Sequence, residues 1–264
     1  MRKAGIYSIF VFLTVLGLAS CEEKTTPLDS DDPIGEYSPN KDEIVYDEYV
    51  SGIDMDDSLR TGNSLFYSKG EGQFTEVEFF VNDKNEMVKM IEFYTQKSMT
   101  IAKNIFYFKD GRKFATKELF EDGEGEELHF VERVSYYGED EKPIITKKKQ
   151  AMYEQDLDYE SYEVAANYDC DMTRALEILN QEGAFNTTFQ GFVKEDVFLY
   201  IIVGGDDPED YSSSLIVQNV DNTIMKLQKN EVDMIGTPLT INFNTVEDAG
   251  EGFEYQILTS ASIR

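Results

Sequence analysis

Between about Ser64 and Tyr153, segments rich in Phe, Tyr, Val and Ile are separated by short turn sequences. Aromatic and β-branched residues favour strands, whereas Gly, Asn and Asp favour tight turns. The turn sequences are Gly70-Glu71-Gly72, residues 82–85, Asp110-Gly111 and Asp122-Gly123. Because such short turns pair each strand with the next along the chain, this stretch predicts an antiparallel meander sheet.

Pairs of adjacent aromatic residues in the expected strands indicate that both faces of this sheet are apolar. Phe79-Phe80 and Tyr136-Tyr137 are two examples. Neighbouring side chains in a strand point to opposite faces. We therefore expect one core face and a second, partly covered face.

Two of the turns predict strand registers. Asp110-Gly111 favours a two-residue type I′ hairpin, because Gly tolerates a positive φ. That loop would place Lys103 opposite Glu118, and a four-residue loop at 82–85 would place Glu78 opposite Lys89. Opposite charges in facing positions support both registers.

After residue 160 the pattern changes to alternating helices and strands. Asp171 can cap a helix from about Met172 to Gln181, which Gly183 would close. Its expected apolar face consists of Met172, Ala175, Leu176, Ile178 and Leu179. The elements expected next are strands at 185–194, 197–203 and 215–220, a short helix carrying Ile224, Met225 and Leu227, and strands at 239–246 and 253–263. The fold class is therefore mainly β, with an α+β C-terminal part.

The order of three strands, a helix and two strands over residues 185–263 resembles the OB-fold (oligonucleotide/oligosaccharide-binding) barrel. Gly236-Thr237-Pro238 stands where such barrels often open their fourth strand. The resemblance implies a ligand face on the strands from about 185 to 220. A generic α+β sheet domain is the alternative.

The first twenty residues have the parts of an export signal. Arg2 and Lys3 precede an apolar run over residues 6–18, which is shorter than the roughly 20 residues that span a bilayer. The following Leu18-Ala19-Ser20-Cys21 resembles the lipobox of bacterial lipoproteins. The resemblance implies cleavage before Cys21, a diacylglyceryl thioether on its sulfur and a third acyl chain on the new amino group. The alternative is an ordinary secretory signal with a chance cysteine.

Residues 21–43 are rich in acidic residues, Pro, Ser and Thr, which predicts a disordered tether. Glu22-Glu23 resembles the acidic signals that place some lipoproteins on the cell surface, although the tether can equally start acidic by chance. We therefore expect an outer-membrane lipoprotein on the periplasmic face or the cell surface. Its segments would be a signal peptide (1–20), the tether (21–43), a meander domain (44–160) and an α+β domain (161–264).

The chain is strongly acidic, with a formal net charge of −28. Nucleic acid and anionic lipid headgroups repel such a surface, so neither is an expected partner. Membrane attachment would depend on the lipid at Cys21 alone. Acylation of Cys21 would leave Cys170 without a partner for an internal disulfide, since the chain has two cysteines.

No catalytic, metal or cofactor-binding residue is predicted. His129 is the only histidine, and Cys170 is the only cysteine besides Cys21. Both His129 and Cys170 are expected to be structural. The stretch 54–58 begins like an EF-hand loop, but Leu59 and Leu65 stand where Gly and Glu are needed. The acidic run 206–210 fits a solvated loop better than a weak cation site.

These features favour a non-catalytic binding or assembly module for a glycan or a protein, contacting it through exposed tyrosines. Carriage of a hydrophobic ligand in a half-barrel and carboxylate-based hydrolysis of glycans are the alternatives. A continuous apolar cavity would favour the carrier, two converging buried carboxylates the enzyme, and an aromatic patch the binder.

Overall fold

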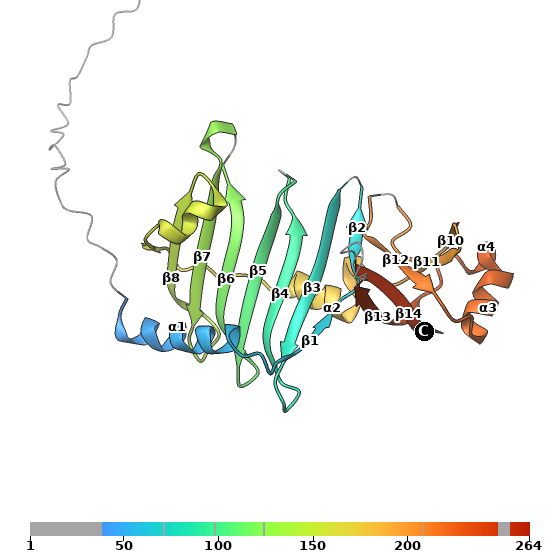
Figure 1. Ribbon diagram of the computed structural model, residues 1–264, viewed down its shortest axis with the longest axis horizontal. Helices are drawn as coiled ribbons and strands as arrows, with labels where there is room; N and C mark the ends of the chain where they lie inside the picture. Colours follow the sequence, from blue (N-terminus) through green and yellow to red (C-terminus); the bar gives the residue numbers. More distant parts are fainter. Residues whose placement is uncertain (1–38, 71, 98, 124, 208, 248–253) are drawn as a thin grey trace, which may run out of the picture. The chain divides into compact units, whose positions relative to one another are not determined.

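A computed structural model describes residues 39–247, apart from residues 71, 98, 124 and 208, and residues 254–264. Cys21, the expected signal peptide and most of the expected tether lie outside the described residues. Within them, fourteen strands are hydrogen-bonded into one sheet, with short helices at its faces and C-terminal end (Figure 1). The prediction of a mainly β fold with an α+β C-terminal part is confirmed.

An antiparallel meander forms the first part of the sheet, as predicted. Each strand from β2 to β9 pairs with the next, and the short β1 pairs with β3 beside β2. The tight turns between consecutive strands allow this local pairing. The strands are β1 (Arg60–Asn63), β2 (Tyr67–Lys69), β3 (Gln73–Val81), β4 (Met87–Thr95), β5 (Ile101–Lys109), β6 (Arg112–Asp122), β7 (His129–Tyr137), β8 (Pro143–Ala151) and β9 (Glu163–Ala165).

Helix α1 (Lys41–Asp54) covers part of one face of the meander. Its Tyr46, Val50 and Ile53 pack against a cluster that includes the buried Tyr107 and Tyr136. The predicted tether, which extended to residue 43, overlaps the start of this helix. Asn40 accepts hydrogen bonds from the first turn, and Glu43 bonds back to the amide of Asn40, so a capping box fixes the helix start.

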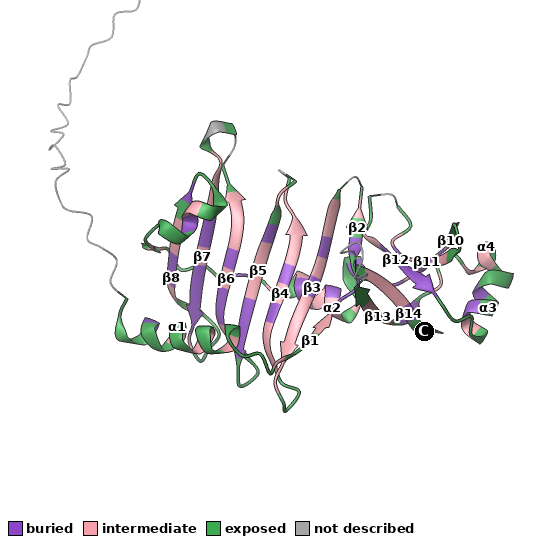
Figure 2. Cartoon of the chain, in the orientation of Figure 1, coloured by how far each residue is buried: buried purple, intermediate pink, exposed green. Residues whose placement is uncertain are grey.

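Helix α2 (Thr173–Asn180) packs on the opposite face, where the larger core lies. Val77, Met90 and Phe106 of the meander join one apolar cluster with Ala175 and Ile178 of α2 and with the C-terminal strands. Buried side chains therefore occur on both faces of the sheet, as predicted, and concentrate along the middle of the strands (Figure 2). Short 3-10 helices lie at Gly125–Glu127, Glu154–Tyr159 and Gly183–Phe185.

The C-terminal part has the predicted order of three strands, a helical segment and two strands. They are β10 (Phe189–Glu195), β11 (Phe198–Gly204), β12 (Ser212–Val217), α3 (Asn222–Lys229), α4 (Glu231–Met234), β13 (Leu239–Glu247) and β14 (Glu254–Ile263). β12 pairs in parallel with β14, which pairs antiparallel with β13. A bridge between Thr188 and Pro238 connects the start of β10 to the start of β13. β12 also joins the meander through one pair, Ser212 with Ser68.

The hairpin at Asp110-Gly111 is confirmed, but the register predicted from it is wrong. Both residues have positive φ, 53° and 74°, and Lys109 pairs with Arg112 across the loop. A bulge at Phe114 then shifts the pairing by one residue, because Tyr107 pairs with Ala115 and Phe108 with Lys113. Glu118 consequently faces Asn104 rather than Lys103.

The predicted Glu78–Lys89 pair is also wrong. Val81 pairs with Met87, so the loop contains five residues rather than four. A bulge at Val88 shifts the register further, and Lys89 faces Phe80 while Glu78 faces Ile91. Glu78 and Lys89 are thus diagonal neighbours.

Helix α2 has the predicted apolar face but different ends. Asp171 accepts hydrogen bonds from the amide and hydroxyl of Thr173, just outside the helix. The left-handed residue that ends the helix is Gln181, with a φ of 55°, rather than Gly183. The side chain of Gln181 also hydrogen-bonds to the backbone of Ile241 in β13.

Candidate functional site

The residues considered for catalysis from the sequence lie apart and have structural surroundings. His129, at the start of β7, makes its ring contact through Nδ1, 2.7 Å from the carbonyl oxygen of Glu127. Cys170 is buried, 3% exposed, and its backbone amide donates to the hydroxyl of Tyr137. Burial raises the pKa of its thiol, and nearby Glu118 raises it further. A nucleophilic cysteine needs the opposite shift.

Carboxylates of the two acidic stretches that were considered as cation sites already have partners within the protein. Asp54 ends α1, where it bonds to Lys89 Nζ at 2.6 Å and to the hydroxyl of Tyr107. Asp56 and Asp207 accept hydrogen bonds within their own turns. In the described part of the chain, no three His, Cys, Asp or Glu side chains are grouped to hold a metal ion.

Three buried carboxylates of the meander are paired with cations. Arg174 of α2 reaches Glu92 at 2.5 Å, and Arg133 donates two hydrogen bonds to Glu118 at 2.8 and 3.0 Å. Glu132 lies between Lys117 and Lys149 and accepts from Tyr162. Burial opposes ionisation of Glu132, but these partners outweigh it and lower its pKa. Because each carboxylate is paired with a cation, these groups support the sheet instead of offering reactive carboxylates.

Many of the tyrosines are core residues. Tyr67, Tyr107, Tyr136 and Tyr137 are almost fully buried, and burial is the main cause that raises the pKa of three of them, Tyr67, Tyr107 and Tyr137. They therefore pack the two faces of the sheet and are not available as contact residues. Exposed aromatic side chains must supply any stacking surface.

Such a surface lies where the C-terminal strands meet the meander. We call it the aromatic groove, a recess of about 190 Å³ lined by Phe66, Ser68, Tyr200, Ser214, Ile216, Glu254, Tyr255 and Gln256. Cross-strand pairing sets Tyr200 beside Ile216. Phe66, 42% exposed, stacks on Phe74 with ring centroids 5.3 Å apart.

Gln256 fixes one wall of the groove. Its Oε1 accepts from the amide of Phe66 and its Nε2 donates to the carbonyl of Ser64, both at 2.9 Å. These two bonds attach the linker between β1 and β2 to β14. The groove is therefore held by side chains from both parts of the fold, and its lining combines aromatic rings with hydroxyl and amide groups and the carboxylate of Glu254.

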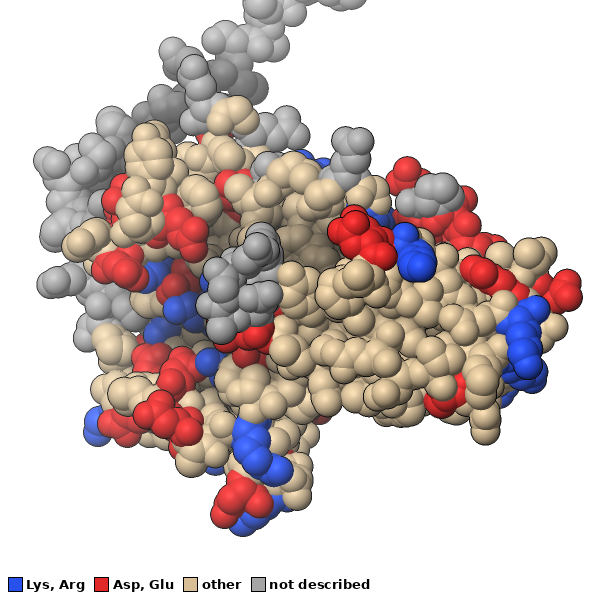
Figure 3. Space-filling view, turned by 45° about the vertical axis from the view of Figure 1, so that its right-hand side comes forward, with Lys and Arg blue, Asp and Glu red and all other residues tan. Residues whose placement is uncertain are grey.

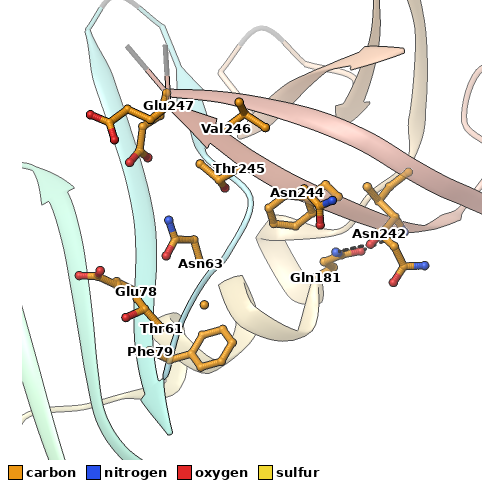
Figure 4. Close-up of a pocket in the computed structure, with 14 residues that line it drawn as sticks. Thr61, Asn63, Glu78, Phe79, Gln181, Asn242, Asn244, Thr245, Val246 and Glu247 are labelled. Atoms are coloured by element: carbon orange, nitrogen blue, oxygen red, sulfur yellow. Dashed lines mark hydrogen bonds between the residues drawn. The ribbon is translucent and has the colours of Figure 1, made fainter. Parts of the chain in front are cut away.

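A larger recess adjoins it, which we call the strand-edge cleft. It has a volume of about 950 Å³ and lies between β1 and β3 on one side and β13 on the other. Figure 4 shows Asn63 of β1 across the cleft from Asn244 and Thr245 of β13. The lining residues are Thr61, Gly62, Asn63, Glu78, Phe79, Gln181, residues 241–247 and Glu254.

Two glutamates near these recesses, Glu76 and Glu78, have a raised pKa to which the charge of Glu254 contributes. Burial raises the pKa of Glu76, and the charges of Glu254 and Glu78 raise it further. The pKa of Glu78 is raised as well, by burial first, with Lys89 opposing and Glu254 adding to the shift. Glu254 lines both recesses.

In comparisons with protein-family models, with curated proteins and with solved structures, no match was found. The site therefore has to be inferred from this geometry. Sequence reasoning placed a ligand face on the strands from 185 to 220, which contain Tyr200, Ser214 and Ile216. It missed Phe66, Glu254, Tyr255 and Gln256, because only the folded chain brings them beside those strands.

Proposed function

We propose that this chain is a cell-envelope lipoprotein, attached to the membrane through lipid on Cys21, whose folded part binds a neutral glycan without catalysis. Among the described residues, no helix is both long and apolar enough to cross a membrane. Attachment by acyl chains needs no such helix, since two or three chains hold a protein firmly.

We further propose that residues 185–264 form an OB-like barrel. The strand order β10-β11-β12-β14-β13, with β12 and β14 parallel, supports this proposal. The Thr188–Pro238 bridge supports closure of the barrel between its first and fourth strands. Such barrels use their second and third strands to bind ligands, and here those strands are β11 and β12.

The observation that carries the glycan proposal is the aromatic groove on β11 and β12. Tyr200, Tyr255 and Phe66 offer rings for stacking on sugar, and Ser68, Ser214 and Gln256 offer hydrogen-bond groups. The side of the molecule that carries the C-terminal strands shows a broad area with few charged side chains, and both acidic and basic residues lie at its margins (Figure 3). An uncharged ligand suits such a surface better than a polyanion.

The two described recesses give less support to carriage of a hydrophobic ligand. A carrier needs a continuous apolar cavity. Instead, the aromatic groove has a volume of only about 190 Å³, and the strand-edge cleft is lined largely by amide, hydroxyl and carboxylate side chains.

Calorimetry with a set of neutral oligosaccharides tests the proposal. Tyr200→Ala should weaken binding about ten-fold, which corresponds to about 1.4 kcal/mol of lost contact. Tyr153→Ala removes a tyrosine that is 56% exposed and does not line the groove, so it should leave affinity unchanged. A short oligonucleotide should not bind at physiological salt. If no glycan binds, the assignment to a glycan is wrong and a protein partner takes its place.

The carboxylate-based hydrolase is the second candidate, and the raised pKa values of Glu76 and Glu78 favour it. Glycoside hydrolysis needs one carboxyl that keeps its proton near neutral pH and a second that is ionised. Release of reducing ends from the same glycans, abolished in Glu78→Gln, would establish the enzyme. Binding without any release would leave the non-catalytic proposal standing.

A further inference from the structure

The strand-edge cleft is bounded by two strand edges that have no partner strand among the described residues. β1 pairs with β3 on one side only. β13 pairs with β14 along its length, while its other edge contacts the start of β10 only near Pro238. An unpaired strand edge presents backbone donors and acceptors that readily pair with another extended chain.

Gln181 shows that the edge of β13 accepts amide partners. Its Nε2 donates to the carbonyl of Ile241 at 3.0 Å, and its Oε1 accepts from the amide of Ile241 at 3.4 Å (Figure 4). One side-chain amide thus makes the two bonds that a neighbouring strand would make. Its Oε1 also accepts from the hydroxyl of Thr187 at 3.2 Å, and the edge of β13 continues beyond Ile241.

Phe243 and Thr245 are the next residues of β13 whose backbone N–H and C=O groups point away from β14. Backbone N–H and C=O groups of alternate residues point to the same side of a strand. The bulge in this hairpin places its extra residue, Thr259, on β14, so the alternation along β13 is not interrupted. Phe243 and Thr245 therefore direct their backbone groups to the side where Gln181 lies, and both line the cleft.

The charges of the cleft select the kind of chain that fits. Its lining includes Glu78, Glu247 and Glu254 but no Lys or Arg among the residues described there. The net charge of −28 opposes the approach of a second copy of this chain. A basic segment is attracted by the same field.

We propose that the strand-edge cleft binds an extended, basic peptide segment of a partner protein, which adds to the edge of β13. Its backbone pairs with Phe243 and Thr245, continuing the ladder that Gln181 begins at Ile241. Alternate side chains of the segment face β1 and β3, where Asn63 of β1 and Glu78 of β3 receive them. This is β-strand addition, in which the backbone supplies affinity and the alternate side chains supply specificity.

The test uses the full chain in mild detergent and a short synthetic peptide of alternating lysine and threonine. A second peptide has the same sequence with alternate backbone nitrogens methylated, which keeps the charge but prevents strand pairing. The unmodified peptide should bind roughly ten-fold more tightly, since methylation removes one or two backbone hydrogen bonds. Its binding should also slow hydrogen exchange at the amides of Phe243 and Thr245.

Asn244→Arg places a cation in the cleft at an exposed strand position and should weaken binding of the unmodified peptide by a similar factor. Val193→Arg adds the same charge at a half-exposed strand position that does not line the cleft, and should have little effect. These outcomes together support strand addition.

Equal affinity for the two peptides would overturn the proposal, because it would show that charge alone attracts them. A dimer that forms without peptide and is lost in Asn244→Arg would assign the edge to a second copy instead. Protection of Phe243 and Thr245 by a neutral oligosaccharide would assign the cleft to glycan. None of these results depends on whether the aromatic groove binds sugar.

Discussion

At the scale of single residues, Gly111 is required by its backbone conformation rather than by its surroundings. Its φ is 74°, and a Cβ added there would meet nothing within 4 Å. Gly111→Ala should therefore destabilise the protein by about 1 kcal/mol through the backbone alone. Gly52→Ala is the matched control, because Gly52 lies in α1 with the same open space and should be neutral or stabilising.

Chemical denaturation of both variants measures this difference. Equal losses in the two would contradict a conformational role for Gly111. Lys103→Ala, which removes a cation 5.7 Å from the ring of Phe93, should cost less than Gly111→Ala.

Glu76 makes the free energy of unfolding decrease as the pH rises. Its pKa in the folded protein is raised, by burial and then by Glu254 and Glu78, so the folded state holds the proton to higher pH than the unfolded state. Ionisation therefore costs stability above the folded pKa, and the cost is absent below the ordinary value of 4.5. Glu76→Gln should stabilise the protein at neutral pH.

This stabilisation should diminish as the pH falls toward 4.5. Thermal melts over a pH series check it. Glu48→Gln, at an exposed position of α1, separates the effect from a general loss of negative charge. A constant gain at every pH would mean that Gln improves packing and that the charge of Glu76 costs nothing.

At the scale of elements, the strands could be predicted from the sequence because residue type and turn residues both act locally. The type I′ turn at Asp110-Gly111 is an example. The registers could not be predicted, because a bulge adds a residue without a sequence signal of its own. Phe114 and Val88 look like ordinary strand residues, yet each shifts its pairing.

Helix α1 was not predicted from the sequence, because its residues follow an acidic, proline-containing segment without a break in composition. A signal was nevertheless present. Asn40 and Glu43 have the spacing of a capping box, and Tyr46, Val50 and Ile53 recur at helical intervals. Most of the candidate site was beyond prediction for another reason, since residues as distant in sequence as Phe66 and Gln256 form one wall.

Asn40→Ala tests the capping box. The substitution removes the acceptor for the amides of Asp42 and Glu43 and should destabilise the protein by about 1 kcal/mol. Asn40→Asp keeps an acceptor at the same place and should retain most of the stability. If both variants match the parent in denaturation, α1 contributes little to the folded state.

At the scale of the whole molecule, the proposed anchor separates membrane attachment from the folded surface. Cys21→Ser should abolish incorporation of labelled palmitate and release the protein from the membrane fraction. Cys170→Ser keeps the lipobox and should retain both the label and the membrane location. Unchanged membrane recovery of the Cys21 variant would rule out lipid on Cys21 as the sole attachment.

The position of α1 determines how the fold responds to mechanical tension. A pull applied at Asn40, the cap of this helix, loads α1 before it loads the strands of the meander. The contacts of Tyr46 and Asp47 are loaded first, then that of Tyr49, and those of Asp54 last, so we expect them to break one after another. Extension of the 14 freed residues lengthens the chain by about 25 Å. We therefore expect the helix to detach and extend before any strand of the meander bears the load.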